Sequence, residues 1–279
     1  MIGTLQEWFA RLAVAAPAAA PASRPIFAGY TLLHMLAQTL LAAVVLALSS
    51  TTLAAPVTES IEERQYTYTP SYNWGSSGGV SAATTSGACT KYEVISARGT
   101  TESQTAPYGN TATVNGILNQ VAGGGRYEVV YPADNNFATG PTIGATDLIN
   151  YVNGRLASCP SMKFVLIGYS QGAMVTVTAE NNAQLPRNAV VATILYGNPY
   201  WLPGRPEDAG TATYGRGDAS ATGTKTPASY QSITKDYCNT GDVICTSTGS
   251  IYAHLAYSGS PQQTQAIAFA ASQLRAAGI

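Results

Sequence analysis

One serine of the chain stands where a nucleophile is expected. Ser170 is the centre of residues 168–172, Gly-Tyr-Ser-Gln-Gly, between the apolar run 163–167 and a run with helical character. A Gly-x-Ser-x-Gly turn of this kind lifts the hydroxyl above the edge of a sheet, and its two glycines let strand and helix pass closely. The amino end of the following helix favours developing negative charge. The segment therefore predicts a serine that attacks a carbonyl carbon.

The same five-letter pattern occurs at residues 75–79, around Ser77. That match lies in a stretch rich in Tyr, Ser, Thr, Gly and Asn, with no strand pattern before it and no helical pattern after it. Because the turn depends on strand, serine and helix in succession, we interpret Ser170 and not Ser77 as the nucleophile.

A nucleophilic serine needs a base, and the chain holds two histidines. His34 lies in an apolar N-terminal segment that we expect to be removed, which leaves His254. Histidine suits this task because its ordinary pKa of about 6.5 lets it accept and return a proton near neutrality. Activity is therefore expected to fall on acidification.

The third group must be a carboxylate that orients the imidazole, and it is expected between the serine and the histidine in chain order. Four aspartates qualify by order: Asp208, Asp218, Asp236 and Asp242. We favour Asp242 because two cysteines bracket it, and a disulfide closing that loop would hold the carboxylate still. Asp236 is the alternative, although we expect it to be a strand-end or surface charge.

Four cysteines follow the N-terminal segment, at positions 89, 159, 238 and 245. An even number in an exported chain indicates two disulfides, with three possible connectivities, and the spacing of Cys238 and Cys245 favours a local loop. A zinc site is the competing interpretation, but the chain has no CxxC pair and only one histidine to offer.

The elements that must position these residues alternate between short apolar runs and longer amphipathic ones, a pattern typical of βαβ units around a parallel sheet. We expect five strands, at 92–97, 127–131, 163–167, 190–196 and 232–237, and helices at 111–121, 143–156, 171–184 and 262–276. Together they predict a three-layer, doubly wound α/β fold. Residues 197–229 show no regular pattern, so we expect a long loop that is functional or disordered.

The first part of the chain is expected to direct export. The apolar run 31–48 and the small residues up to Pro56 predict a signal peptide cleaved near Ala55, with Met35 as a possible true start. A membrane anchor is less favoured because the run is interrupted and barely spans a bilayer. We therefore divide the chain into an N-terminal extension and signal peptide (1–55), a propeptide or flexible leader (56–87) and a catalytic domain (88–279). A charged fraction of 10% and a net charge of −1 argue against nucleic-acid binding.

Five segments resemble successive signature blocks of the cutinase family: Cys89, residues 97–102 (Ala-Arg-Gly-Thr-Thr-Glu), 168–172, 238–245 and 254–257 (His-Leu-Ala-Tyr). The resemblance implies a compact α/β-hydrolase with a five-stranded parallel sheet and disulfides Cys89 to Cys159 and Cys238 to Cys245. It also implies ester hydrolysis without a cofactor or metal, and an oxyanion hole formed by the backbone N–H groups of Thr100 and Gln171.

The resemblance leaves the ester open. Cutin-like polyesters and soluble short-chain esters are expected first. Acetylated xylan is the alternative, because residues 198–229 are longer than in compact cutinases, although the small number of cysteines argues against it. Four apolar side chains, Tyr200, Trp201, Ile251 and Tyr252, could form a rim for acyl chains or simply pack in the interior. A secreted, wall-associated binding protein without catalysis is the non-enzymatic alternative. We expect an extracellular monomer.

Overall fold

The structure is a computed structural model and describes residues 89–279. The expectations for the signal peptide, for Met35 as the start, for Ser77 and for the leader fall on residues 1–87, outside the described part of the chain. The described part of the chain begins at Cys89.

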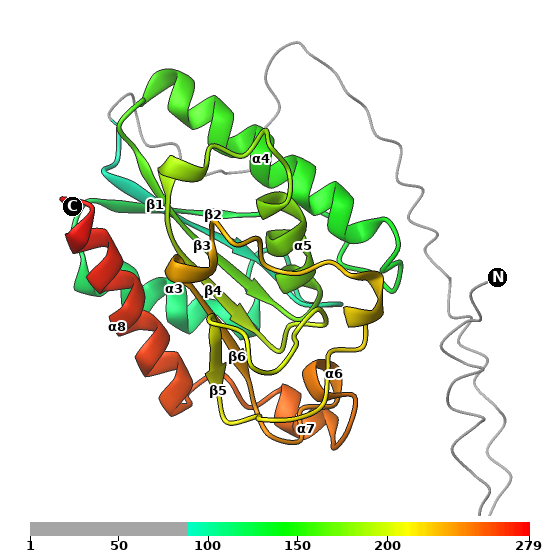
Figure 1. Cartoon of the computed structure of the whole chain (residues 1–279). Helices are drawn as coiled ribbons and strands as arrows, with labels where there is room; N and C mark the ends of the chain where they lie inside the picture. Colours follow the sequence, from blue (N-terminus) through cyan, green and yellow to red (C-terminus); the bar gives the residue numbers. More distant parts are fainter. Residues whose placement is uncertain (1–88) are drawn as a thin grey trace, which may run out of the picture. The chain divides into compact units, whose positions relative to one another are not determined.

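A sheet of six parallel strands forms the centre of the domain, in the order β2-β1-β3-β4-β6-β5 (Figure 1). The strands are β1 (Tyr92–Ala97), β2 (Gly124–Glu128), β3 (Lys163–Tyr169), β4 (Val190–Tyr196), β5 (Asp208–Gly210) and β6 (Thr234–Cys238). The chain first moves from β1 outward to β2, then returns to β3 and continues in the opposite direction. The carboxyl ends of β1 and β3 therefore meet where the winding reverses, which is where open α/β sheets bind ligands.

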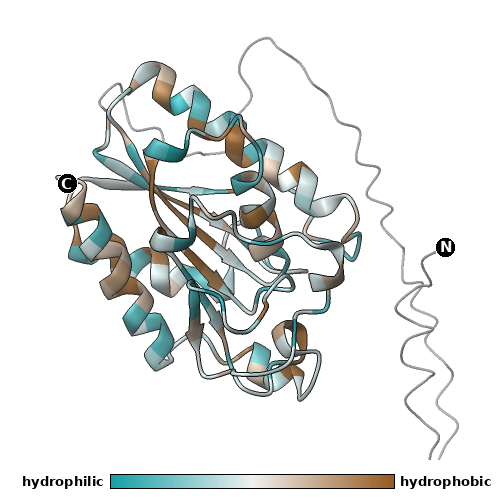
Figure 2. Cartoon of the chain, viewed as in Figure 1, coloured by the Kyte–Doolittle hydropathy of each residue, from teal (hydrophilic) through white to brown (hydrophobic). Residues whose placement is uncertain are grey.

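Helices cover both faces of the sheet, as the sequence predicts. On one face lie α3 (Tyr108–Gln120) and α8 (Pro261–Ala276), and on the other lie α4 (Gly140–Ser158) and α5 (Gln171–Glu180). Along β3, Phe164 and Leu166 pack on the α4 and α5 side, whereas Val165 and Ile167 pack on the α3 and α8 side. A strand buried on both faces has a continuous apolar sequence, and Figure 2 shows hydrophobic residues concentrated in the central strands.

Two features of the sheet differ from the expectation. The predicted count of five strands is one too few, because β5 pairs with β6 at the edge. This three-residue strand lies inside segment 197–229 and is too short to show a periodic pattern. The second strand begins at Gly124 and ends at Glu128, earlier than the predicted 127–131. Its glycines face β1, where a β-carbon on Gly124 would meet the ring of Tyr92.

The rest of the domain consists of short elements, most of them in the loops that follow β4 and β6. They are the helices α6 (Val243–Thr246) and α7 (Ile251–His254) and the 3-10 turns η1 (Arg187–Ala189), η2 (Ser220–Thr222) and η3 (Gln231–Ile233). Residues 197–229 form an ordered loop with its own buried side chains. Within residues 89–279, no helix combines the length and the apolar character needed to cross a membrane.

Candidate active site

Ser170 lies at the turn between β3 and α5, with backbone angles of φ 55° and ψ −121°. A non-glycine residue in this region is strained, and such strain is concentrated at functional sites. Its N–H donates to the carbonyl oxygen of Tyr196 at 2.9 Å. A β-carbon on Gly172 would overlap the carbonyl oxygen of Ala97, and one on Gly168 would lie 2.6 Å from Cα of Ala173. The two glycines of the motif are therefore required by the close passage of strand and helix.

His254 and Asp242 are in contact and buried. Nδ1 of His254 lies 3.0 Å from each carboxylate oxygen of Asp242, and Asp242 is 0% exposed. Because Nδ1–H donates to the carboxylate, Nε2 carries the lone pair that can accept a proton. Asp242 also caps α6, where its Oδ1 accepts the N–H of Ile244 at 2.8 Å.

Tyr169, which precedes Ser170 in the chain, and Gly197 lie against the imidazole of His254. The ring of Tyr169 stacks on the ring of His254 with centroids 5.0 Å apart, and its hydroxyl donates to the carbonyl oxygen of His254 at 3.1 Å. Gly197, which follows β4, lies against both His254 and Asp242: a β-carbon there would be 2.6 Å from Nδ1 of His254 and 2.9 Å from Oδ2 of Asp242. Ser170, Gly197 and Asp242 thus lie beyond the carboxyl ends of β3, β4 and β6, and His254 contacts the last two of these residues.

Two disulfides tie the domain: Cys89 to Cys159 and Cys238 to Cys245. These are the pairings that the family resemblance implies. The second one closes the loop that carries Asp242, and Cys245 also donates its backbone N–H to Oδ1 of Asp242 at 3.4 Å. With all four cysteines oxidised in pairs, none is a thiolate for the zinc site considered above.

The loop after β1 presents a free backbone donor beside the serine. The N–H groups of three of its residues are engaged: that of Gly99 with Oε2 of Glu102, that of Thr101 with the carbonyl of Ala133, and that of Glu102 with the carbonyl of Gly99. Within residues 89–279, the N–H groups of Thr100 and Gln171 have no hydrogen-bond acceptor. Thr100 Oγ1 donates to Oε1 of Gln171 at 3.4 Å, which links the two segments. Two unpaired donors, one of them at the start of a helix, suit an oxygen that gains negative charge.

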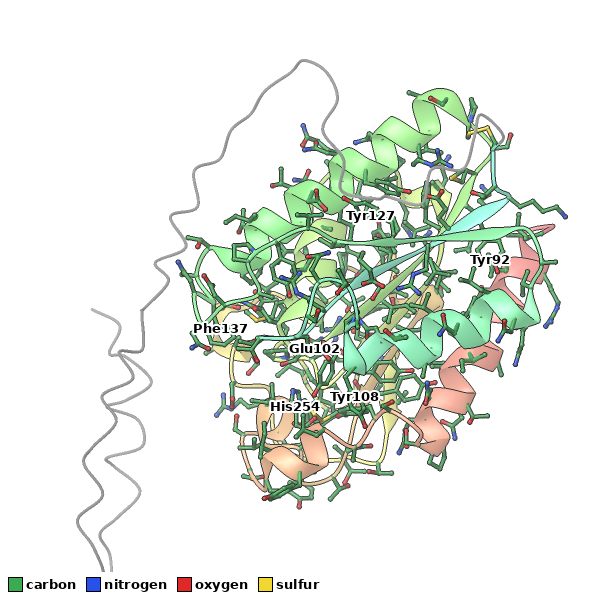
Figure 3. All side chains as sticks on the ribbon, turned by 180° about the vertical axis from the view of Figure 1, so that it is seen from behind. Tyr92, Glu102, Tyr108, Tyr127, Phe137 and His254 are labelled. Atoms are coloured by element: carbon green, nitrogen blue, oxygen red, sulfur yellow. A yellow bond between two sulfur atoms is a disulfide. The ribbon has the colours of Figure 1, made fainter. Side chains whose placement is uncertain are left out.

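Two charged residues that the sequence analysis did not single out hold this loop. The buried guanidinium of Arg98 donates to the carbonyl of Tyr131 and to Gln104, at 2.6 Å each. The carboxylate of Glu102, labelled with His254 in Figure 3, accepts the N–H groups of Gly99 at 2.6 Å and Gly109 at 2.7 Å. Their only sequence signal is their place in block 97–102. Glu102 thereby fastens the loop after β1 to the start of α3.

The other aspartates considered for the third role do not contact His254. Asp236 accepts from Nδ2 of Asn198 at 2.8 Å inside the sheet, and burial raises its pKa well above the ordinary range. It is 4% exposed, so the expectation of a surface charge is wrong. Asp218 accepts from Ser247 at 2.8 Å, and Asp208 belongs to β5. Among the described residues, Asp242 is the only carboxylate paired with His254.

The four apolar residues proposed as a rim divide into two groups. Tyr200 and Trp201 are buried, so they pack in the interior. Ile251 and Tyr252, on the helix that carries His254, are 47% and 82% exposed. Of the four, therefore, only Ile251 and Tyr252 contribute exposed apolar surface next to the base.

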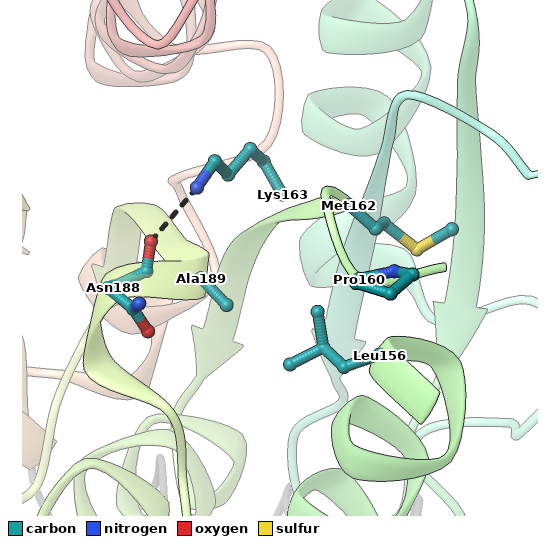
Figure 4. Close-up of a pocket in the computed structure, with 6 residues that line it drawn as sticks. All are labelled: Leu156, Pro160, Met162, Lys163, Asn188 and Ala189. Carbon is teal, nitrogen blue, oxygen red and sulfur yellow. Dashed lines mark hydrogen bonds between the residues drawn. The ribbon is translucent and has the colours of Figure 1, made fainter. Parts of the chain in front are cut away.

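A cavity of about 210 Å³ lies at the amino ends of the central strands (Figure 4). Its lining residues are Leu156, Pro160, Met162, Lys163, Asn188 and Ala189. They surround the beginnings of β3 and β4, whereas Ser170 follows the end of β3. This cavity is therefore separate from the site around Ser170.

The known proteins that are similar to this chain are cutinase-like proteins and esterases. The family model described as Cutinase matches residues 88–274. Carboxylesterase Culp1 of Mycobacterium tuberculosis is 34% identical over 194 residues, 68% of this chain and 84% of that protein. An acetylxylan esterase of Hypocrea jecorina is 34% identical over 214 residues, 68% of this chain and 69% of that protein. Among solved structures, a cutinase-like protein from Cryptococcus sp. is similar with a TM-score of 0.60 at 33% identity, covering 67% of this chain and 97% of that one.

Proposed function

We propose, on the premise that the chain belongs to the cutinase family, that this carboxylic ester hydrolase works through Ser170 as nucleophile, His254 as base and Asp242 as the orienting carboxylate. The observation that carries the proposal is the contact of His254 Nδ1 with both oxygens of Asp242, 3.0 Å each, beside a serine held in a strained turn. This arrangement has the components of a Ser-His-Asp mechanism.

The chemistry would proceed through an acyl-enzyme. Nε2 of His254 takes the hydroxyl proton of Ser170 as Oγ attacks the ester carbonyl, and the backbone N–H groups of Thr100 and Gln171 stabilise the negative oxygen of the tetrahedral intermediate. The intermediate collapses with loss of the alcohol, which receives the proton from the imidazolium. Water then attacks the acyl-enzyme with the same base, and releases the acid and the free serine.

Cutin-like polyesters and short-chain esters are the substrates that we propose. Support comes from the exposed apolar side chains of Ile251, Tyr252 and Leu255, which flank His254 on a protein with few charges. Apolar surface next to the base favours an acyl chain over a sugar hydroxyl. Acetylated xylan is the second candidate, because an acetylxylan esterase is as similar in sequence as the carboxylesterase is.

We further propose that the protein acts outside the cell as a monomer. Two disulfides fit an oxidising compartment, and the sequence predicts a signal peptide with cleavage near Ala55. Edman sequencing of the exported protein would test the cleavage, and a first residue upstream of position 50 would contradict it.

The serine and the carboxylate can be tested on p-nitrophenyl esters of short acids. We expect Ser170→Ala to lower kcat by at least about 10⁴-fold, whereas Ser161→Ala, an exposed serine at the other end of the sheet, leaves it unchanged. Asp242→Asn should also cost orders of magnitude, and Asp236→Asn should not. An unchanged rate in Ser170→Ala would reject the proposal.

The substrate requires a separate comparison on one preparation. Release of hydroxy fatty acids from cutin and release of acetate from acetylated xylan are measured side by side, with Ser170→Ala as the blank. We expect the first to exceed the second. Acetate release alone would favour the second candidate.

A further inference from the structure

We propose that Tyr257 is a positioning residue of the same site, holding the Asp242 carboxylate in the orientation that His254 requires. This inference rests on the proposed function. Tyr257 lies three residues after His254, beyond the end of α7, and is 1% exposed. Its hydroxyl lies 2.5 Å from Oδ2 of Asp242.

The direction of that hydrogen bond is fixed by a second contact. The backbone N–H of Asn239 donates to the Tyr257 oxygen at 3.0 Å, so this oxygen already accepts one bond and its own proton is left to donate. The sulfur of Cys245, at 3.7 Å, is the other acceptor within reach. A charged carboxylate oxygen at 2.5 Å is a much stronger acceptor than a disulfide sulfur. The proton therefore points at Asp242.

The carboxylate depends on this donor because it is buried without a permanent cation. Among the described residues, neither lysine nor arginine pairs with Asp242, and its charge is met by hydrogen bonds alone. Oδ1 accepts two backbone N–H groups, those of Ile244 and Cys245. Oδ2 accepts the hydroxyl proton of Tyr257 and shares the imidazole N–H of His254 with Oδ1. Removal of the tyrosine hydroxyl would leave Oδ2 with the histidine as its one donor, which is costly for a buried charge.

The donor is available throughout the working pH range. Burial and the negative charge of Asp242 raise the pKa of Tyr257 far above the ordinary value for tyrosine. The hydroxyl therefore keeps its proton whenever Asp242 is ionised. A neutral donor on Oδ2 spreads the carboxylate charge, so the pull of Asp242 on the imidazole is weaker than it would be without the tyrosine.

The test is Tyr257→Phe, which removes one oxygen and keeps the ring. We expect kcat to fall by about 10- to 100-fold with KM within about twofold, because substrate does not touch this side chain. We also expect the acid limb of the pH profile of kcat/KM to move to higher pH, because the unshared charge of Asp242 favours the protonated imidazole. In an Asp242→Asn background the same change should have no further effect on kcat, since Tyr257 acts through that carboxylate.

The matched control is Tyr92→Phe. Tyr92 is equally buried, and its hydroxyl donates to the carbonyl of Val121 at 2.6 Å, at the opposite end of the sheet from His254 (Figure 3). This variant should lose stability and keep the wild-type pH profile. The inference is overturned if the pH profile and kcat of Tyr257→Phe match wild type, or if Tyr92→Phe moves the acid limb equally.

A measurement on the wild-type chain covers the case in which Tyr257→Phe does not fold. Proton NMR of protein with labelled tyrosine should show a slowly exchanging phenolic proton far downfield, as expected for a short bond to a charged acceptor, that moves upfield in Asp242→Asn. The absence of such a proton overturns the inference. If Asp242→Asn itself keeps full activity, the proposed function fails first; if only Tyr257→Phe is without effect, the role of Tyr257 alone is lost.

Discussion

Gly197 lies directly against His254: a β-carbon at this position would be 2.5 Å from Cε1 and 2.6 Å from Nδ1 of the imidazole. The residue follows β4 with φ +55°, a left-handed conformation that disfavours a β-carbon. The backbone thus makes room for the ring at the point where β4 ends. Nothing larger than glycine fits without displacement of the histidine or of Asp242.

We expect Gly197→Ala to lower kcat by about 100-fold or more, because a displacement of the base by even 1 Å costs about that much. The matched control is Gly204→Ala. Gly204 has a similar conformation, φ +81°, but a β-carbon there meets open space. The control should lose about 1 kcal/mol of stability and no activity. Equal kinetic effects in the two variants would show that backbone strain, and not contact with His254, is responsible.

The two disulfides are predicted to have separate roles. The bridge Cys89 to Cys159 closes 70 residues, which by loop entropy contributes about 4 kcal/mol, whereas Cys238 to Cys245 closes 7, which contributes about 2 kcal/mol. Replacement of the first pair by alanine should lower Tm by about 10 °C and leave kcat close to wild type. Replacement of the second pair should lower kcat more than stability, because Asp242 lies in its loop. Full kcat without the second bridge contradicts this assignment.

The sequence predicts those elements whose pattern is set by burial alone. Strands β1 and β4 have the predicted bounds, since both are short, mainly apolar runs buried on the two faces of the sheet. The predicted bounds of β2 are wrong because an edge strand pairs on one side only, and because the ring of Tyr92 leaves no room for a β-carbon at Gly124, where the strand starts. The three residues of β5 become a strand only because β6 offers them an edge. That information is tertiary and has no local pattern.

The candidate site divides in the same way. Ser170, Asp242 and His254 could be chosen from local motifs and chain order, because each stands in a recognisable segment. The roles of Gly197 and Tyr257 depend on contacts between chain segments that are distant in sequence or separated by a turn. A glycine after a strand has many uses, and only the position of the imidazole reveals this one.

Glu102 is predicted to matter for rate rather than for substrate binding. Its two oxygens accept the N–H groups of Gly99 and Gly109, which fixes the loop that carries Thr100. In Glu102→Gln an amide NH₂ faces one of these donors, so the loop loses a tether. We expect kcat to fall by about tenfold with little change in KM, since the N–H of Thr100 meets charge mainly in the transition state. Glu93→Gln, which loses the ion pair with Arg155 at 2.8 Å, serves as control and should affect stability alone.

Glu180 is predicted to make stability fall as pH rises. It is buried at the end of α5, where Oε1 accepts from Thr193 at 2.7 Å and Oε2 has no partner within the described residues. Burial raises its pKa to about 8, with Glu207 adding to the shift and Arg187 opposing it. The folded chain therefore keeps this carboxyl protonated at neutral pH, whereas in the unfolded chain it ionises near its ordinary value of about 4.5.

The sign of the effect follows from proton binding. Below about pH 4.5 Glu180 is protonated in both the folded and the unfolded state, so it has no effect on the pH dependence of stability. Between about pH 4.5 and 8 only the unfolded state has lost the proton, so each pH unit removes about 1 kcal/mol of stability. Above about pH 8 this loss of stability is complete. Glu180→Gln resembles the neutral acid and cannot ionise. We expect its Tm to match wild type at pH 4.5 and to exceed it by a growing margin at pH 6 and pH 8. Scanning calorimetry of both proteins at these three pH values decides the matter, and a difference in Tm that is constant with pH would show that Glu180 is ionised in the folded protein.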